Sequence, residues 1–76
     1  MTYYEFLRLS EAEQADMVWY GRFYSFRQEA DCTVMLYKVG EFYVEVYYHM
    51  EDNSIIKMRP FKAKRFLQPY FNIHSN

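Results

Sequence analysis

The chain has 76 residues, 51% of them hydrophobic and 22% aromatic, and a formal net charge of −1 at pH 7. This length fits one domain, taken here to span residues 1–76, and leaves little room for the pocket of ~300 Å³ or more that small-molecule sites usually have. Since each aromatic side chain buries roughly 150–250 Å², a core of this size cannot enclose nine tyrosines, seven phenylalanines and one tryptophan. Some of these rings are therefore expected on the surface.

Targeting signals and disulfide bonds are not expected. The N-terminus MTYYEFLRLSEAEQ carries acids early and has no apolar core, unlike a secretory signal peptide, and no window approaches the ~20 apolar residues of a membrane span. The single cysteine, Cys32, has no partner for an internal disulfide and is expected to be a small buried side chain. These features predict a cytoplasmic location and no membrane partner.

Two short helices are predicted at the start of the chain. Thr2 with Glu5, and Ser10 with Glu13, have the spacing of capping boxes, in which hydroxyl and carboxylate satisfy free N–H groups at a helix start. The second helix is predicted over residues 11–19, ending at Gly21. The residues of this helix expected to face the core are Ala12, Ala15, and Val18 or Trp19.

From residue 22 the pattern changes to that of strands. Strands are predicted over residues 22–29, 32–39, 42–51 and 55–62, with turns between them. Gly40 suits the first position of a two-residue hairpin, and Pro60 places the last strand at a sheet edge. Residues 63–71 are predicted to form a short C-terminal helix. The fold class is therefore α+β, with two short N-terminal helices packed on a four-stranded antiparallel meander.

The third strand has two registers, and side chains alternate between sheet faces. The register expected under the helices contains Phe42, Val44, Val46, Tyr48 and Met50. The register expected on the outer face contains Tyr43, Glu45, Tyr47 and His49. The register of the fourth strand stays open: a three-residue loop brings Ile56 and Met58 to the core, whereas a two-residue loop brings Ile55, Lys57, Arg59 and Phe61 there.

No constellation of residues predicts catalysis or a metal site. His49, Glu51 and Asp52 are close in sequence, but His49 and Glu51 share one strand register and have no third ligand at metal spacing. The chain also has no phosphate-binding glycine loop and no CxxC motif. We therefore expect no catalytic residues, no metal and no cofactor, and predict that the protein is not an enzyme.

The charge is unevenly distributed along the chain. Residues 1–53 hold ten acids and four bases, a net charge of −6, whereas residues 54–76 hold five bases and no acid. Those five bases alternate with Phe61 and Phe66, a pattern that can bind phosphates and stack on unpaired bases. The nucleic-acid alternative therefore rests on Lys57, Arg59, Lys62, Lys64 and Arg65. A solvated strand edge and helix would give the same pattern.

The segments FLRLSEAEQADMVW and LYKVGEFYVEVYYH give the chain a resemblance to short proteins of Bacteroidetes, some of them associated with mobile elements. The resemblance covers residues from 5 to about 59 and rests on spacing and aromatic pattern. It implies a cytoplasmic bacterial accessory protein. It implies no activity and no site residues.

The aromatic content predicts a small module that binds a second copy of itself or another protein. The second strand is apolar in both registers, which is typical of a strand covered on both faces or of a sheet that meets another protein. The contact face is predicted on the outer side of the sheet, where Tyr and Arg would supply binding energy. Its residues are Tyr43, Glu45 and Tyr47, the neighbouring Tyr37 or Leu36, and Arg59 at the rim. Cross-strand tyrosine pairs with hydrated hydroxyls are the alternative.

Overall fold

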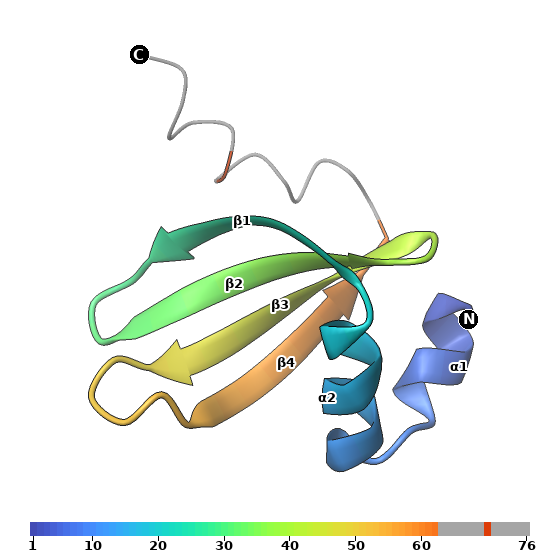
Figure 1. Cartoon of the computed structure of the whole chain (residues 1–76), viewed down its shortest axis with the longest axis horizontal. Helices are drawn as coiled ribbons and strands as arrows, with labels where there is room; N and C mark the ends of the chain where they lie inside the picture. Colours follow the sequence, from blue (N-terminus) through green and yellow to red (C-terminus); the bar gives the residue numbers. More distant parts are fainter. Residues whose placement is uncertain (63–69, 71–76) are drawn as a thin grey trace.

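The computed structural model describes residues 1–62 and Tyr70, and it shows two helices followed by an antiparallel sheet (Figure 1). The helices are α1 (Tyr3–Leu7) and α2 (Glu11–Trp19). The strands are β1 (Arg22–Gln28), β2 (Cys32–Val39), β3 (Phe42–His49) and β4 (Ile55–Phe61), in the order β1-β2-β3-β4. The predicted α+β meander is confirmed. The predicted C-terminal helix lies outside the described residues, apart from Tyr70.

Both predicted capping boxes are present. The Thr2 hydroxyl accepts from the Glu5 N–H at 3.1 Å while the Glu5 carboxylate accepts from the Thr2 N–H at 2.8 Å. Ser10 and Glu13 make the same reciprocal pair at the start of α2. These bonds satisfy orphan donors in helices that are too short to be stable alone, so the helix starts are fixed by local sequence.

Tight turns set the register of the central hairpin. Val39 pairs directly with Phe42, so Gly40 and Glu41 form a two-residue turn, as predicted. Gly40 has a φ of 60°, a conformation that glycine adopts without a Cβ clash. This register places Val34 and Leu36 beside Tyr43 and Tyr47, on one face of β2 and β3.

The register of β4 combines the two alternatives left open by the sequence. Met58 pairs with Val46 and Ile55 pairs with Tyr48, with a register shift between Tyr47 and Tyr48. The shift leaves Ile56 as an extra residue, exposed to solvent, so both Ile55 and Met58 pack on the core. Lys57, Arg59 and Phe61 consequently lie on the opposite face, and Pro60 lies in an edge strand as predicted.

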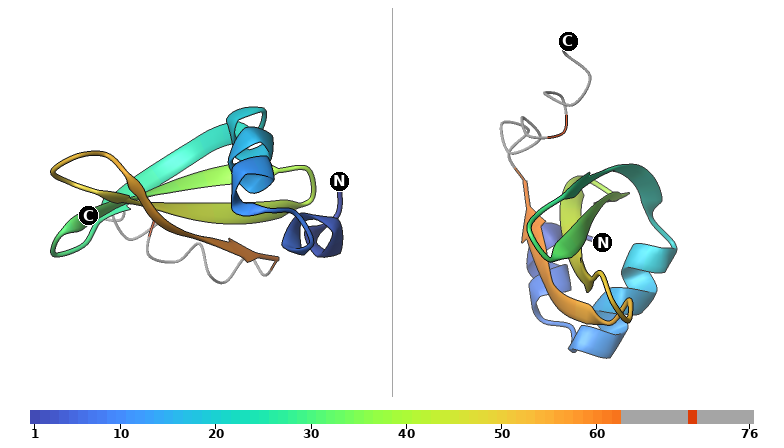
Figure 2. Two further views of the ribbon diagram at one scale, coloured as in Figure 1. Left: turned by 90° about the horizontal axis from the view of Figure 1, so that it is seen from below. Right: turned by 90° about the vertical axis from the view of Figure 1, so that its left-hand side faces the viewer.

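The main core lies between the helices and one face of the sheet, here called the helix-side face. Phe6 and Val18 from the helices pack against Val39, Phe42, Val44 and Val46 from β2 and β3. Two views show the helices near one end of the sheet, while the β1–β2 and β3–β4 turns extend beyond them (Figures 1 and 2). Part of the helix-side face is therefore not covered by a helix.

Candidate functional site

The opposite face of the sheet, here called the outer face, carries most of the residues predicted for partner binding. Glu45 in β3 pairs with Arg59 in β4. The Arg59 side chain donates from Nε to Glu45 Oε1 at 2.8 Å, and its Nη2 lies 2.8 Å from the same oxygen. The structure thus places Glu45, Tyr47 and Arg59 on the outer face, as predicted. Tyr47 and Arg59, however, both bond to the Glu45 carboxylate of the same chain.

Glu45 is the centre of a buried polar network. Its side chain is 1% exposed, and besides Arg59 it accepts from the Tyr70 hydroxyl at 2.8 Å, the Tyr47 hydroxyl at 3.3 Å and Arg27 Nη2 at 3.3 Å. A buried carboxylate is costly unless it is paired and hydrogen-bonded, and here both oxygens have charged and neutral donors. The arrangement is that of a structural anchor which joins β1, β3, β4 and Tyr70.

The environment of this network favours charged guanidinium and neutral phenol groups. Burial disfavours the charged form of Arg27, but its hydrogen bond to Glu29 and the negative charge of Glu45 raise its pKa overall. Burial, together with the nearby Glu45 carboxylate, raises the pKa of Tyr70 and of Tyr47. Both phenols therefore keep the proton that they donate to Glu45.

Three of the residues predicted for the contact surface on the outer face are not exposed. Tyr43, Glu45 and Tyr47 are buried, because Phe61 stacks on Tyr43 at 5.6 Å between ring centroids and Tyr70 closes over Glu45. Leu36 does lie on this face, in a cluster with Tyr43, Phe61 and Tyr70.

Tyr37 is not on that face. It pairs with Val44 and packs against the core under the helices. Its neighbour Leu36 takes the outer position because adjacent residues in a strand point to opposite faces.

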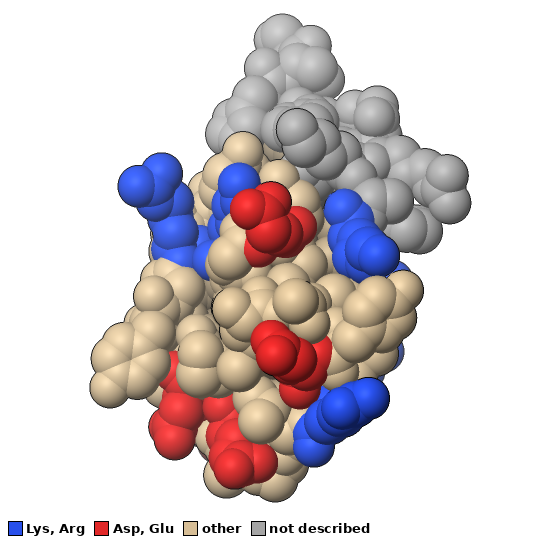
Figure 3. Space-filling view, turned by 90° about the vertical axis from the view of Figure 1, so that its right-hand side faces the viewer, with Lys and Arg blue, Asp and Glu red and all other residues tan. Residues whose placement is uncertain are grey.

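The structure describes three of the five residues of the nucleic-acid alternative. Lys57 and Arg59 lie on the outer face, where Lys57 Nζ is 4.6 Å from the centroid of the Tyr47 ring. Lys62 lies near the rings of Tyr3 and Tyr4. At the end of the molecule where α1 lies, acidic and basic side chains are interspersed (Figure 3). Lys64 and Arg65 lie outside the described residues.

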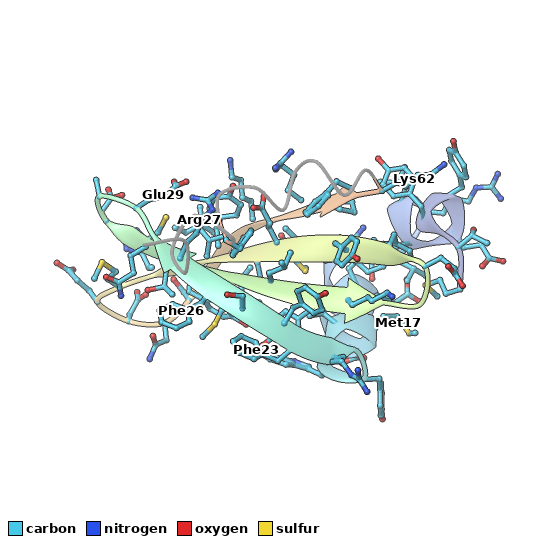
Figure 4. The ribbon with its side chains drawn as sticks, turned by 90° about the horizontal axis from the view of Figure 1, so that it is seen from above. Met17, Phe23, Phe26, Arg27, Glu29 and Lys62 are labelled. Carbon is cyan, nitrogen blue, oxygen red and sulfur yellow. The ribbon has the colours of Figure 1, made fainter. Side chains whose placement is uncertain are left out.

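A group of exposed aromatic side chains is found on the helix-side face. Trp19, Phe23 and Phe26 are 58%, 51% and 51% exposed. Phe23 and Phe26 lie on the side of the sheet that carries α2, whereas Arg27 and Glu29 lie on the other side (Figure 4). Phe23 pairs with Tyr37 and Phe26 pairs with Met35. These two phenylalanines form what we call the β1 strip.

Next to the β1 strip lies a hollow of about 400 Å³. Its walls come from the end of α2, from β2, from β3 and from the β3–β4 turn. The lining residues are Trp19, Thr33, Met35, Tyr37, Tyr48 and Asn53. Trp19 and Tyr37 meet edge to face, with ring centroids 6.1 Å apart and planes at 90°. Burial and the neighbouring Tyr37 raise the pKa of Tyr48 to about 12, so its hydroxyl keeps its proton well above physiological pH.

Sequence reasoning missed the β1 strip for a definite reason. Phe23 and Phe26 are three residues apart, and in a regular strand they would point to opposite faces. A register shift between Phe23 and Ser25 adds Tyr24 as an extra residue, which brings both phenylalanines to one face. No turn or glycine in residues 22–28 signals this bulge.

Other kinds of site are not seen in the described part of the chain. Within residues 1–62 and Tyr70, no group of three or more His, Cys, Asp or Glu side chains is placed to hold a metal ion. Within the same residues, no helix has the length and apolar character needed to cross a membrane. Cys32 is buried, and burial together with Glu29 and Asp31 raises the pKa of its thiol, which disfavours a reactive thiolate.

Three comparisons with known proteins complete the description of the site. No protein-family model, no curated protein and no solved structure matches this chain. The resemblance to short Bacteroidetes proteins therefore stays a prediction, and function must be argued from the two faces of the sheet.

Proposed function

We propose that the protein is a small non-catalytic interaction module that associates with a second copy of itself through the β1 strip. The single observation that supports this most is the exposure of Trp19, Phe23 and Phe26 on one face. Contiguous exposed apolar surface is characteristic of interaction sites, and aromatic side chains are enriched there.

The position of the strip favours a second copy as partner. β1 is an edge strand of the sheet, so its outer backbone groups have no strand neighbour in the described structure. Two β1 strands can pair antiparallel about a two-fold axis, which makes the contact self-complementary. Such a pairing would place the Phe26 rings of both copies on the same face of a continuous sheet. The arginine nearest Phe26, Arg27, points to the outer face and would not oppose this contact.

Size measurement in solution tests this proposal. We expect light scattering to show a dimer whose dissociation constant rises at least about tenfold in a Phe23→Ser, Phe26→Ser double variant. Tyr4→Ser is the matched control, because Tyr4 is an exposed ring on α1, away from the strip. A wild-type protein that stays monomeric at the highest attainable concentration would contradict the proposal.

The remaining parts of the proposal follow from sequence. A cytoplasmic location is supported by the single buried thiol of Cys32. Nucleic-acid binding by Lys57, Arg59 and Lys62, with Lys64 and Arg65, is the second proposal. Its test is a salt titration of binding to single- and double-stranded oligonucleotides, since the electrostatic contribution is strongest at low ionic strength. Arg59 already pairs with Glu45, so this proposal rests mainly on the lysines.

A further inference from the structure

The hollow beside the β1 strip has the size and composition of a binding site. Its volume of about 400 Å³ falls within the ~300–1,000 Å³ typical of ligand sites, and most of its walls are apolar. We propose that it binds a segment of a partner protein that carries a large apolar side chain flanked by lysine or arginine. This inference does not depend on self-association through Phe23 and Phe26.

The walls of the hollow are suited to an apolar anchor residue. Trp19 and Tyr37 stand at 90° to each other, so an inserted side chain can meet the face of one ring and the edge of the other. Met35 adds an adaptable thioether. Thr33 and Asn53 supply the polar groups that could bond to the backbone of a bound segment. The large exposed area of Trp19 is surface that such an anchor would cover.

Charge decides which partner fits this hollow. The basic residues of the four described strands all share the outer register, so no Lys or Arg of these strands faces the helix side. These outer residues are Arg22, Arg27, Lys38, Lys57 and Arg59.

Acids, in contrast, lie close in sequence to lining residues from three parts of the chain. Asp31 lies two residues before Thr33, and Glu51 and Asp52 precede Asn53 in the β3–β4 turn. Asp16 lies one helical turn before Trp19, so the two share a side of α2. All four carboxylates are on exposed residues. Their combined field attracts a basic segment and repels an acidic one, including the same rim on a second copy.

The sole tryptophan of the chain gives a direct readout, because Trp19 lines the hollow. Three peptides without tryptophan serve as probes: Ac-Lys-Lys-Leu-Phe-Lys-Lys-NH₂, the same peptide with Glu in place of Lys, and the basic peptide with Ser-Gly in place of Leu-Phe. We expect the first to change Trp19 fluorescence saturably, with a dissociation constant below about 1 mM. The other two should bind at least about tenfold more weakly.

Each alternative result overturns the inference. Absence of a saturable change with the basic Leu-Phe peptide excludes the site. Equal binding of the acidic peptide excludes the role of the carboxylate rim, and equal binding of the Ser-Gly peptide excludes the apolar anchor. Amide and indole chemical shifts in a titration should move most at Trp19, Thr33 and Asn53, and movement confined to the outer face would also contradict the site.

Variants separate this inference from the proposed self-association. Asp16→Lys combined with Glu51→Lys should raise the dissociation constant of the basic Leu-Phe peptide by at least about fivefold. Glu41→Lys makes the same kind of charge change in the Gly40–Glu41 turn, where it should leave peptide binding unchanged. The Phe23→Ser, Phe26→Ser variant should retain peptide binding as a monomer. If this double variant does not dimerise but still binds the basic Leu-Phe peptide, the two substitutions have removed only the dimer contact. If the wild type dimerises but binds no peptide, only the inference on the hollow fails.

Discussion

The outer face and the helix-side face of the sheet use their aromatic rings in different ways. On the outer face, Tyr43 and Tyr47 are covered by other residues of the same chain, and the Tyr70 hydroxyl is bonded to the buried Glu45. On the helix-side face, α2 ends at Trp19 and leaves Phe23 and Phe26 half exposed. Aromatic content therefore does not by itself locate a contact surface. The covering of each face by the rest of the chain decides which rings remain accessible.

The largest effect should come from removing the centre of the outer-face network. Glu45→Ala leaves Arg27 and Arg59 without their shared carboxylate, and breaking one side of a buried ion pair costs about 3–5 kcal/mol. We expect a loss near the lower end, about 3 kcal/mol, since the Arg59 side chain is 44% exposed. Urea unfolding followed by circular dichroism measures it.

Glu45→Gln is the matched control for this prediction. It keeps the size of the side chain and some of its hydrogen bonds but removes the charge, so its cost should be clearly smaller. A Glu45→Ala variant as stable as the wild type would show that the outer face does not depend on this network.

Two adjacent residues of β2 compare the faces directly. Leu36 is fully buried on the outer face, whereas Met35 is half-buried on the helix-side face beside the hollow. Leu36→Ala should destabilise by about 3 kcal/mol and Met35→Ala by about 1 kcal/mol or less, because only the first leaves a closed cavity. Thermal or urea unfolding checks the difference. Equal losses would mean that both faces are packed to the same extent.

Removal of one hydroxyl tests the closure of the outer face. Tyr70→Phe deletes the hydrogen bond to Glu45 and should cost about 1–2 kcal/mol, with Tyr4→Phe on exposed α1 as a neutral control.

The contribution of Tyr70 to folding stability should decrease at high pH. Its folded pKa is raised above the unfolded value of about 10, so its contribution is fully present below pH ~10 and is lost as pH rises toward the folded pKa. Urea midpoints of the wild type should therefore fall above pH ~10, and less steeply in Tyr70→Phe. A parallel decline in both proteins would contradict the role of Tyr70.

Much of this fold was predictable because its signals are local. The capping boxes at Thr2 and Ser10, the Gly40 turn and the edge position of Pro60 each depend on a few neighbouring residues. The faces of β3 followed from alternation from Phe42 to Tyr48, whereas the prediction for Met50 was wrong, because β3 ends at His49 and Met50 lies exposed in the turn that follows. These features needed no knowledge of distant contacts.

The candidate site was less predictable because it depends on distant contacts and on bulges. Tyr70 is 25 residues from Glu45 in sequence, and no residue near Glu45 predicts that the Tyr70 hydroxyl will bond to its carboxylate. The register shifts in β1 and β4 change the face of Phe23 and of Ile55 without a glycine or proline to mark them. Sequence could therefore predict a surplus of rings, but not the face on which they stay exposed.

The smallest expected effect is local and concerns the rim of the hollow. The Asp52 carboxylate accepts from the Ser54 N–H at 3.0 Å and the Ser54 hydroxyl at 2.8 Å, and these bonds lower the pKa of Asp52. They hold the turn in which Asn53 adopts a φ of 60° and lines the hollow. A lowered folded pKa means that this stabilisation is present above the unfolded value near 4 and disappears as pH falls through the folded pKa.

Amide exchange and chemical shifts at Asn53 and Ser54 should therefore change on acidification before the central strands respond. Asp52→Asn, which cannot titrate, should abolish this local transition while the rest of the molecule unfolds as in the wild type. If Asn53 and the buried strand residue Leu36 instead lose protection together, the helix-side rim is as strongly coupled to the fold as the outer face. The contrast between a closed face and an open one would then not extend to their local stability.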